Sequence, residues 1–367
     1  MSFEKIKKNF GFGCMRLPII DGKVNYSEFN RMIDMFIAAG FNYFDTAHGY
    51  IDGMSETAIR ECLASRYDRE DYVLANKLSS WLFKDSRDII PLFERQLELC
   101  GVDYFDFYIL HSMNKENYQK HLSCNSFEIV KKLKDEGKIR HIAISFHDTA
   151  DVLDTILAQQ PSIEAVQLQI NYLDYDDPNV QSKACYDVAV KYGKKVIVME
   201  PVKGGALVNL PDKAAELLSG RTTGSQASFA LRYAASFENV FMVLSGMGNT
   251  DMMADNIKTM SDFVPLSDSE FELADRLRGI IREVKQIPCT KCNYCADVCP
   301  KKIPVSDIFS VYNGYLAAKL SKAEVKGNLP DKGAGAGDCI KCSRCEEVCP
   351  QNISIRKHLE KVAEKFK

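Results

Sequence analysis

The sequence predicts an α/β protein in which a closed (β/α)8 TIM barrel is followed by a smaller, helix-rich domain. Short apolar runs alternate eight times with helical stretches over about 260 residues, which is typical of parallel strands joined by crossover helices. No Gly-x-Gly-x-x-Gly motif opens a helix after a strand, so an open dinucleotide-binding sheet lacks its signature. The C-terminal part holds eight of the 13 cysteines. We therefore expect one domain over residues 1–285 and a second over residues 286–367.

The expected strands are short apolar runs bounded by turn residues. They cover residues 9–14, 41–46, 72–77, 104–110, 141–145, 165–170, 195–200 and 240–245. Helices are expected where apolar residues recur at spacings of three and four, over residues 26–39, 86–100, 127–135, 180–192 and 225–236, and again from about residue 251. Glycines stand where four of these helices should end, at Gly40, Gly101, Gly137 and Gly193.

The second domain is expected to be mostly helical. A last barrel helix should lie near residues 267–283, after which Pro288 introduces the first of two cysteine runs. Residues 305–322 should form helices between the runs, and residues 355–367 one amphipathic, lysine-rich helix.

The two cysteine runs have the same spacing, Cys-x2-Cys-x2-Cys-x3-Cys-Pro. They comprise Cys289, Cys292, Cys295 and Cys299, and then Cys339, Cys342, Cys345 and Cys349. Paired Cys-x2-Cys motifs also occur in zinc sites, and cysteine-rich secreted domains use disulfide frameworks. A zinc ribbon needs only two such pairs, however, whereas the repeated run supplies four thiolates to each of two clusters with none left over. The spacing therefore favours iron-sulfur clusters.

These runs resemble those of bacterial-type ferredoxins, which hold two 4Fe-4S clusters. In such proteins the fourth cysteine of each run typically ligates the other cluster. The resemblance implies one ligand set of Cys289, Cys292, Cys295 and Cys349, and a second of Cys339, Cys342, Cys345 and Cys299. The long segment between the runs is similar to that of the helix-rich ferredoxins.

Composition and charge exclude several functional classes. The first ten residues are not followed by an apolar stretch of signal-peptide length, and no run approaches about 18 apolar residues, so we expect a soluble, cytoplasmic protein. The formal charge of -3 gives no electrostatic reason to expect nucleic-acid or membrane binding. From Pro288 onward, 14 Lys and Arg face 9 Asp and Glu, a surplus that mostly balances the negative charge of two clusters.

Polar residues fall at the carboxyl ends of three consecutive predicted strands, where barrels place their chemistry. Asp45 ends the second strand and Tyr50 follows it, Lys77 ends the third strand, and His111 ends the fourth. Here the chain resembles the aldo-keto reductases. Its Phe-Asp-Thr-Ala-x-x-Tyr, its strand-ending Lys and its Leu-His match the catalytic tetrad of that family in order. The resemblance covers roughly residues 9–260, and the doubled cysteine run is similar to a tail found in one branch of that family.

The chemistry of the tetrad can be stated from its residue types. A carbonyl that accepts hydride needs a proton on its oxygen, and Tyr50 is the expected general acid. The ammonium of Lys77 favours the ionised phenol and would bring its pKa toward working pH, while Asp45 fixes Lys77. His111 would hydrogen-bond the carbonyl oxygen and orient the substrate.

The resemblance also implies a nicotinamide dinucleotide across the barrel mouth. Ser145 and Gln167 match residues that face the carboxamide, and the loops after strands seven and eight are the usual phosphate site of this fold. The further cofactor candidates are Lys203, Gly204, Ser245, Gly246, Asn249 and Asn256.

Two departures from the family pattern bear on this cofactor. Phe146 follows Ser145 where many members have Asn, and Met199 stands where an aromatic ring commonly stacks on the nicotinamide. Residues 248–256 contain no Lys or Arg, so NADH is slightly favoured over NADPH, whose 2′-phosphate needs a basic partner.

Three functions are compatible with the sequence. The first is an NAD(P)H-dependent reductase of a small carbonyl substrate, or the reverse alcohol dehydrogenase, in which the clusters are structural or regulatory. The second is an electron-transfer oxidoreductase whose clusters exchange electrons with a ferredoxin or flavoprotein partner. The third, a scaffold with a vestigial pocket, is disfavoured by the intact tetrad. Nicotinamide transfers two electrons as hydride and a cluster transfers one, so linking them normally needs a flavin or another intermediate.

Overall fold

The structure is a computed structural model that describes residues 3–222, 224–317, 319–329 and 335–366. Contacts within the chain divide it into two compact units. The first unit comprises residues 1–201 and 223–267, and the second comprises residues 202–222 and 268–367. Each unit is described in turn.

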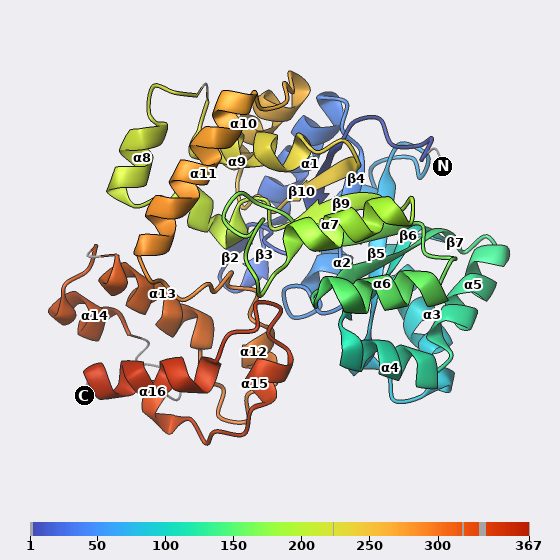
Figure 1. The fold of residues 1–367 in the computed structure, drawn as a ribbon. Coiled ribbons are helices and arrows are strands. Elements are labelled where there is room, and N and C mark those ends of the chain that lie inside the picture. The colour runs from blue at the N-terminus through green and yellow to red at the C-terminus, as the bar shows by residue number, and fades with distance from the viewer. Residues whose placement is uncertain (1–2, 223, 318, 330–334, 367) are drawn as a thin grey trace. The chain divides into compact units, whose positions relative to one another are not determined.

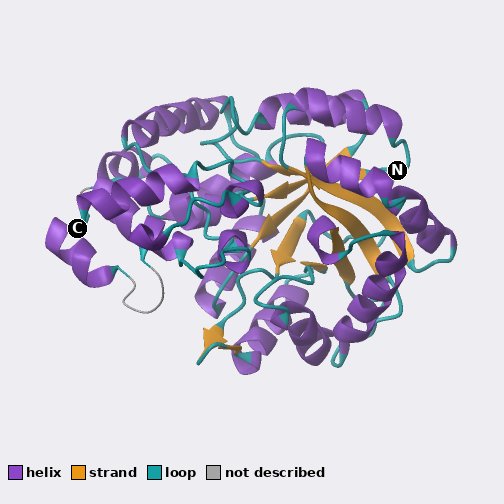
Figure 2. Ribbon diagram, turned by 90° about the horizontal axis from the view of Figure 1, so that it is seen from below, coloured by secondary structure: helices purple, strands orange, loops and turns teal. Residues whose placement is uncertain are grey.

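The first unit is built around a closed barrel of eight parallel strands in the order β1-β10-β9-β8-β7-β6-β5-β4, with β1 and β4 completing the ring (Figures 1 and 2). The strands are β1 (Phe10–Gly13), β4 (Tyr43–Asp45), β5 (Val73–Ser79), β6 (Phe105–Met113), β7 (Ile139–Phe146), β8 (Ala165–Gln169), β9 (Lys195–Met199) and β10 (Val240–Ser245). All eight predicted strands are present, and the predicted barrel is confirmed.

Helices alternate with these strands along the chain and surround the barrel (Figure 2). They are α1 (Tyr26–Ala38), α2 (Met54–Ile59) with a π-helical turn (Arg60–Ala64), α3 (Ile89–Cys100), α4 (Lys115–Ser123), α5 (Ser126–Asp135), α6 (Ala150–Gln159), α7 (Ser182–Lys191), α9 (Gln226–Ala235) and α10 (Thr250–Ser261). A short hairpin of β2 (Ile19–Ile20) and β3 (Lys23–Val24) lies outside the barrel. The hairpin, α2, α4 and α6 were not singled out from the sequence.

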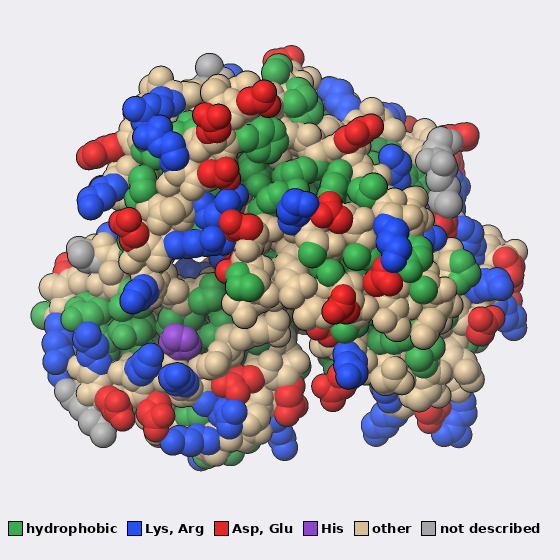
Figure 3. Space-filling view, in the orientation of Figure 1, with side chains coloured by type: hydrophobic (Ala, Val, Ile, Leu, Met, Phe, Trp, Pro, Cys, Tyr) green, Lys and Arg blue, Asp and Glu red, His purple; other side chains and the backbone are tan. Residues whose placement is uncertain are grey.

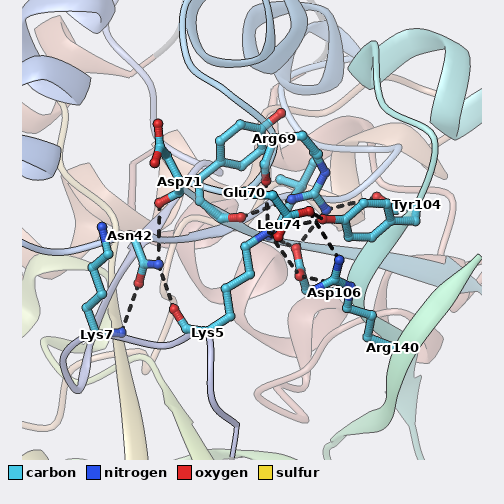
Figure 4. Close-up of polar contacts among 11 residues, drawn as sticks. Lys5, Lys7, Asn42, Arg69, Glu70, Asp71, Leu74, Tyr104, Asp106 and Arg140 are labelled. Atoms are coloured by element: carbon cyan, nitrogen blue, oxygen red, sulfur yellow. Dashed lines mark hydrogen bonds and ion pairs between the residues drawn. The ribbon is translucent and has the colours of Figure 1, made fainter.

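The amino end of the barrel is closed by side chains that precede or begin the strands. Phe3 and Ile6 pack against the barrel-interior cluster, and the ring of Phe3 lies 4.5 Å from that of Phe241. At the same end of the barrel, the buried carboxylate of Asp106 accepts a hydrogen bond from Arg69 at 2.7 Å and another from the backbone N–H of Leu74 at 2.9 Å (Figure 4). Polar residues at this end of a barrel contribute to stability, because catalysis takes place at the opposite end.

The second unit is mostly helical. It includes the expected helical region over residues 286–367, and also residues 202–222 and 268–285, which the sequence had assigned to the barrel. Its helices are α8 (Asp212–Leu218), α11 (Asp268–Glu283), α12 (Tyr294–Asp297), α13 (Val305–Leu316), α14 (Lys322–Asn328), α15 (Arg344–Glu347) and α16 (Ile355–Lys365). Helix α8 contacts α11, and an apolar core that includes Ile303, Phe309 and Leu359 joins α13 to α16. Lysine and arginine side chains gather over α13 to α16, with acidic side chains between them (Figure 3).

Among the described residues, each helix is too short or too polar to span a lipid bilayer. This agrees with the sequence, in which apolar runs stay short.

Candidate active site and cysteine cavities

Asp45 and Lys77 form a buried ion pair at the carboxyl ends of adjacent strands β4 and β5. Nζ of Lys77 donates to the Asp45 carboxylate and, at 2.9 Å, to the carbonyl oxygen of Thr46. Burial raises the pKa of Asp45 and lowers the pKa of Lys77, while the attraction between the two opposes both shifts. Lys77 is therefore held in place by its partner and gives up a proton more readily than a surface lysine.

Tyr50 lies beside this pair on the turn that follows β4. The turn requires consecutive left-handed residues, with φ of 54° at Ile51, 52° at Asp52 and 83° at Gly53. The phenol ring is 8% exposed, and its centroid lies 4.8 Å from Nζ of Lys77. The turn thus places the nearly buried ring of Tyr50 beside the ammonium of Lys77.

His111 completes the group from β6. Its ring centroid lies 6.3 Å from that of Tyr50, and burial keeps the pKa of the imidazole well below its usual range, so the ring is neutral. The Ser79 hydroxyl lies 2.7 Å from Nδ1 of His111. If Ser79 donates to Nδ1, the other nitrogen, Nε2, carries the hydrogen and can donate to a substrate oxygen. The side chain of Trp81 is 46% exposed, and the distance between its ring centroid and that of His111 is 5.2 Å. Trp81 is therefore a candidate for one wall of the substrate site.

A backbone irregularity positions the end of β6. Ser112 has φ of 55°, and the β6–β7 register shifts between Leu110 and Met113. The Ser112 N–H donates to Oγ of Ser145 at 2.7 Å, and the Ser112 carbonyl accepts from Asn117 at the same distance. Ser145, a predicted carboxamide partner, therefore also anchors the strand that carries the imidazole.

A buried polar network supports the strand that carries Lys77. Asn76 donates to the Glu56 carboxylate at 2.8 Å, and Gln96 donates to the Lys77 carbonyl at 2.9 Å. Glu56 is fully buried and also lies 2.6 Å from Nδ1 of His48, whose pKa it raises. A polar group this deeply buried is tolerated only when it is hydrogen-bonded, and these hydrogen bonds restrain β5.

The other predicted cofactor residues of the first unit lie within β8, at and after the end of β10, and at the N-cap and in the middle of α10. Gln167 is buried, and its amide nitrogen lies 3.5 Å from Asp45. Asn256 donates to Oγ of Ser245 at 2.8 Å, and Asn249 caps α10 by accepting from the N–H of Met252 at 2.8 Å. The structure brings Gln167 to the tetrad and joins Ser245 to Asn256.

An arginine that was not singled out from the sequence lies beside Gly246. A Cβ atom added at Gly246 would lie 3.6 Å from Nη1 of Arg16. Arg16 follows β1, is partly exposed, and forms an ion pair with Glu200 at 3.4 Å. A guanidinium beside a glycine backbone at the carboxyl end of a barrel suits a phosphate group.

A carboxylate occupies the start of α10. Oε1 of Glu28, from α1, accepts from the N–H of Thr250 at 2.9 Å, and this bond lowers the pKa of Glu28. Arg31 pairs with the same carboxylate from the exposed side of α1. The positive end of the α10 dipole is thus already neutralised by a protein side chain.

The remaining two predicted cofactor residues, Lys203 and Gly204, belong to the second unit. Lys203 is buried, and a Cβ atom at Gly204 would lie only 2.4 Å from the carbonyl oxygen of Thr290. Gly204 has φ of 60°, so both backbone conformation and space require glycine there. The glycine that was predicted for close approach to a phosphate packs closely against the first cysteine run.

The eight cysteines line two cavities, each formed by three cysteines of one run and the fourth of the other. Cys289, Cys292, Cys295 and Cys349 line the first cavity, and Cys299, Cys339, Cys342 and Cys345 line the second cavity. This grouping matches the crossed arrangement of ferredoxin ligands. Four thiols around an apolar space fit a 4Fe-4S cluster.

The two sites share an apolar framework. Val305 lines both cavities, and Ile303, Phe309, Ile353 and Ile355 surround them. Burial raises the pKa of the Cys345 thiol to about 11, so the thiolate form of this ligand would need stabilisation by bound iron.

Several residues of the candidate active site, Trp81 among them, were not identified from the sequence. Ser79 lies two residues after Lys77 on the same strand, so strand periodicity could have indicated that both face the same side. Glu56, Arg16 and Glu28 come from a helix, a loop and another helix, and no local pattern links them to the strand ends.

Comparisons with known proteins agree with this geometry. Residues 9–278 match the family model described as Aldo/keto reductase family, and residues 288–354 match the model described as 4Fe-4S dicluster domain. An aldo-keto reductase of Mycolicibacterium smegmatis is 27% identical over 204 residues, 55% of this chain and 66% of that protein. The uncharacterized oxidoreductase YqkF of Bacillus subtilis is 26% identical over 216 residues, 56% of this chain and 65% of that protein. The matched part of the chain therefore spans about two thirds of these relatives.

Solved structures share the barrel fold. The holo form of the aldo-keto reductase AKR11C1 from Bacillus halodurans superposes with a TM-score of 0.62 at 24% identity, over 74% of this chain and 92% of that one. An aldo-keto reductase from Klebsiella pneumoniae in complex with NADPH gives a TM-score of 0.60 at 18% identity, over 74% and 95% of the two chains.

Proposed function

Because the chain belongs to the aldo/keto reductase family and carries a 4Fe-4S dicluster domain, we propose that it is an NAD(P)H-dependent oxidoreductase of a small carbonyl or alcohol substrate. The observation that carries the proposal is the convergence of Tyr50, Lys77 and His111 from three different parts of the barrel rim. Residues 1–285 would carry the reductase and residues 286–367 would hold the two clusters, while residues 202–222 and 268–285 belong to the same compact unit as the cysteine runs.

In this proposal the protein's own residues donate the proton and stabilise the charge that develops on the substrate oxygen. When bound, the nicotinamide supplies a hydride, which carries two electrons to the carbonyl carbon. The C=O π electrons move to the oxygen, which takes a proton from the Tyr50 hydroxyl. Lys77, fixed by Asp45, stabilises the resulting phenolate, and His111 donates from Nε2 to the same oxygen as negative charge builds on it. Solvent then returns the proton to Tyr50.

Arg16 and the backbone at Gly246 are the groups proposed to hold the cofactor's pyrophosphate. Both belong to the first unit, and they are close enough for a single phosphate group to contact both. Gln167 and Ser145 would face the carboxamide, with Ser245 and Asn256 farther along the cofactor. The hydrogen bonds that these four side chains make to protein groups would hold them in position before the cofactor arrives.

We further propose that NADH is preferred over NADPH. The carboxylate of Glu28 accepts from the first N–H of α10, so a 2′-phosphate near that end would meet a like charge instead of an open helix terminus. Arg31 lies on the exposed side of the same carboxylate and partly offsets it.

A second candidate function is electron transfer through the cysteine-rich domain. The observation that favours it is that the eight cysteines line two separate cavities of four, since a single structural metal would need only one. In this function the clusters would exchange electrons with a ferredoxin or flavoprotein partner.

The decisive experiment for the reductase is substitution of the acid. Oxidation of NADH is followed with a panel of small aldehydes and ketones, and Tyr50→Phe should abolish turnover while leaving NADH affinity within about twofold of wild type. Tyr118→Phe, a buried tyrosine outside the site, is the control and should keep activity. Retained turnover in Tyr50→Phe would remove Tyr50 from the acid role.

A further inference from the structure

The two cysteine cavities differ in exposure and in the charge of their linings. Apart from its cysteines, the first cavity is lined by neutral side chains. The lining of the second cavity includes Lys301 and Arg356, and its ligand Cys342 is exposed. A protein outside the chain could therefore approach the second cavity more closely than the first.

The first cavity is shielded on one side within the second unit. Thr290, which lines it, is 2% exposed, and a Cβ atom at Gly204 would lie 2.4 Å from the Thr290 carbonyl oxygen. The loop that begins at Val202 therefore covers this part of the first cysteine run. No comparable cover is seen over Cys342 among the described residues.

An apolar side chain marks the opening of the second cavity. Ile340 lines this cavity and is 56% exposed. Isolated exposed apolar residues are ordinary on protein surfaces. Ile340 is, however, the one large hydrophobic residue exposed to this degree among the described residues of the second unit, and it lies between two cysteines of the run. Its position makes it suited to an apolar contact at the centre of a small interface.

The charges around the cavities also differ. The segments that form and flank the second cavity, residues 299–303, 338–347 and 354–361, contain seven Lys and Arg against four Asp and Glu. The corresponding segments of the first cavity, residues 288–298, 305–309 and 349–353, contain one Lys against two Asp. Two of the four acids near the second cavity are paired with two of the seven basic residues, Glu346 with Arg356 and Glu360 with Lys341, so these pairs leave the surplus of three unchanged.

We propose that Lys301, Ile340, Lys341 and Arg356, here called the carrier surface, dock an acidic electron-carrier protein that exchanges electrons at the second cavity. The inference rests on the proposed presence of iron-sulfur clusters. One electron leaves the reduced carrier and is taken up at the site formed by Cys299, Cys339, Cys342 and Cys345, so that the carrier is oxidised and the site reduced without proton transfer. The surplus of three positive charges in these segments exceeds the net charge of about -2 that one oxidised cluster with four thiolates brings, so the opening stays positive and attracts the carrier. Ile340 provides an uncharged contact at the centre of the surface.

The experiment uses the full, iron-loaded chain under anaerobic conditions. A reduced plant-type ferredoxin, which is small and acidic, is mixed with the chain in a stopped-flow instrument, and bleaching of the visible absorbance of the chain is recorded. The variant Lys301→Glu/Lys341→Glu should slow this reaction about tenfold at low salt, and the difference should shrink as ionic strength increases. Ile340→Ser should slow it at every salt concentration.

Two controls distinguish weaker docking of the carrier from damage to the protein or its clusters. Photoreduced deazaflavin, a small reductant without the acidic surface of ferredoxin, should reduce the variants at nearly the wild-type rate. Lys322→Glu/Lys326→Glu on α14 makes the same change in net charge at exposed lysines outside both cavity linings and should leave the ferredoxin rate unchanged. Binding of oxidised ferredoxin, measured by calorimetry, should weaken only in the carrier-surface variants.

Several outcomes would overturn the proposal. They are an unchanged ferredoxin rate in Lys301→Glu/Lys341→Glu, an equal slowing with deazaflavin, and an equal slowing in the α14 control. A chain that contains no iron would instead refute the proposed iron-sulfur function itself, so the two failures are distinguishable.

Discussion

The Ser79 hydroxyl lies 2.7 Å from Nδ1 of His111, and the two residues are direct partners in the parallel β5–β6 pair. The register of the two strands therefore places the Ser79 hydroxyl beside Nδ1. If Ser79 donates there, Nε2 carries the ring hydrogen that the proposed reaction uses. Ser79 is a positioning residue in the proposed reaction, because it acts through His111.

Ser79→Ala should lower kcat by roughly tenfold, because the imidazole loses the donor that fixes its tautomer. Ser79→Thr keeps the hydroxyl and should restore most of the activity. The measurement is steady-state kinetics of carbonyl reduction, with kcat and KM determined separately. Equal activity of the Ala and Thr variants would show that the hydroxyl plays no part in orienting His111.

Glu28→Gln should narrow the preference for NADH over NADPH by roughly tenfold, because the carboxylate at the start of α10 loses its charge but can still accept from Thr250. The check is titration of both cofactors by quenching of Trp81, the single tryptophan of the chain. Asp34→Asn, on the same helix α1, is the matched control and should leave the ratio unchanged. A wild-type protein that binds NADPH more tightly would contradict the proposed preference.

Anaerobically purified protein should be brown and contain about eight iron atoms per chain. Cys342→Ser should lose on the order of four of them, because Cys342 lines one cavity only. Metal analysis and the visible spectrum provide the measurement, and Cys62→Ser, a change at a buried cysteine of the barrel unit, should retain all the iron. Stoichiometric zinc in a colourless protein would rule out the clusters.

Acid should destabilise the barrel through His121. This imidazole is fully buried, neither ring nitrogen has a hydrogen-bond partner among the described residues, and burial lowers its pKa to about 3. Its unfolded value is about 6.5, so below that pH the unfolded chain binds more protons, and the free energy of unfolding falls as the pH decreases toward 3. At pH 5 the loss is on the order of 2 kcal/mol.

His121→Phe should reduce this loss between pH 7 and pH 5. Urea unfolding followed by the fluorescence of Trp81 measures it, and Ser123→Ala on the same helix should keep the wild-type pH dependence. An unchanged pH dependence in His121→Phe would assign the acid sensitivity to other groups.

The barrel was predictable because its signal is repeated and local. Eight apolar runs of similar length need only be counted, and the residues at their ends follow from the rule that parallel strands share one functional edge. The grouping of Cys349 with the first run was implied by the resemblance of the cysteine runs to bacterial-type ferredoxins, and Cys349 lines that cavity.

What the sequence did not indicate depends on contacts between distant segments. Glu28 and Thr250, which share a hydrogen bond, are 222 residues apart in the sequence, and the paired side chains of Arg16 and Glu200 are 184 residues apart. Such pairs leave no spacing pattern, because the fold alone brings their elements together. The turn after Tyr50 was similarly hidden, since Ile51 and Asp52 adopt left-handed conformations that their residue types rarely favour.

The packing of Gly204 against Thr290 has a consequence for how this chain can be divided. Residues 202–222 lie between β9 and α9 in the sequence, and both of these elements belong to the barrel unit. Residues 202–222 themselves belong to the same compact unit as the cysteine runs. The two units are interleaved along the sequence, so a single cut cannot separate them. A fragment ending at residue 285 would leave residues 202–222 without Thr290, against which Gly204 packs, and should therefore be less stable than the same residues in the full chain.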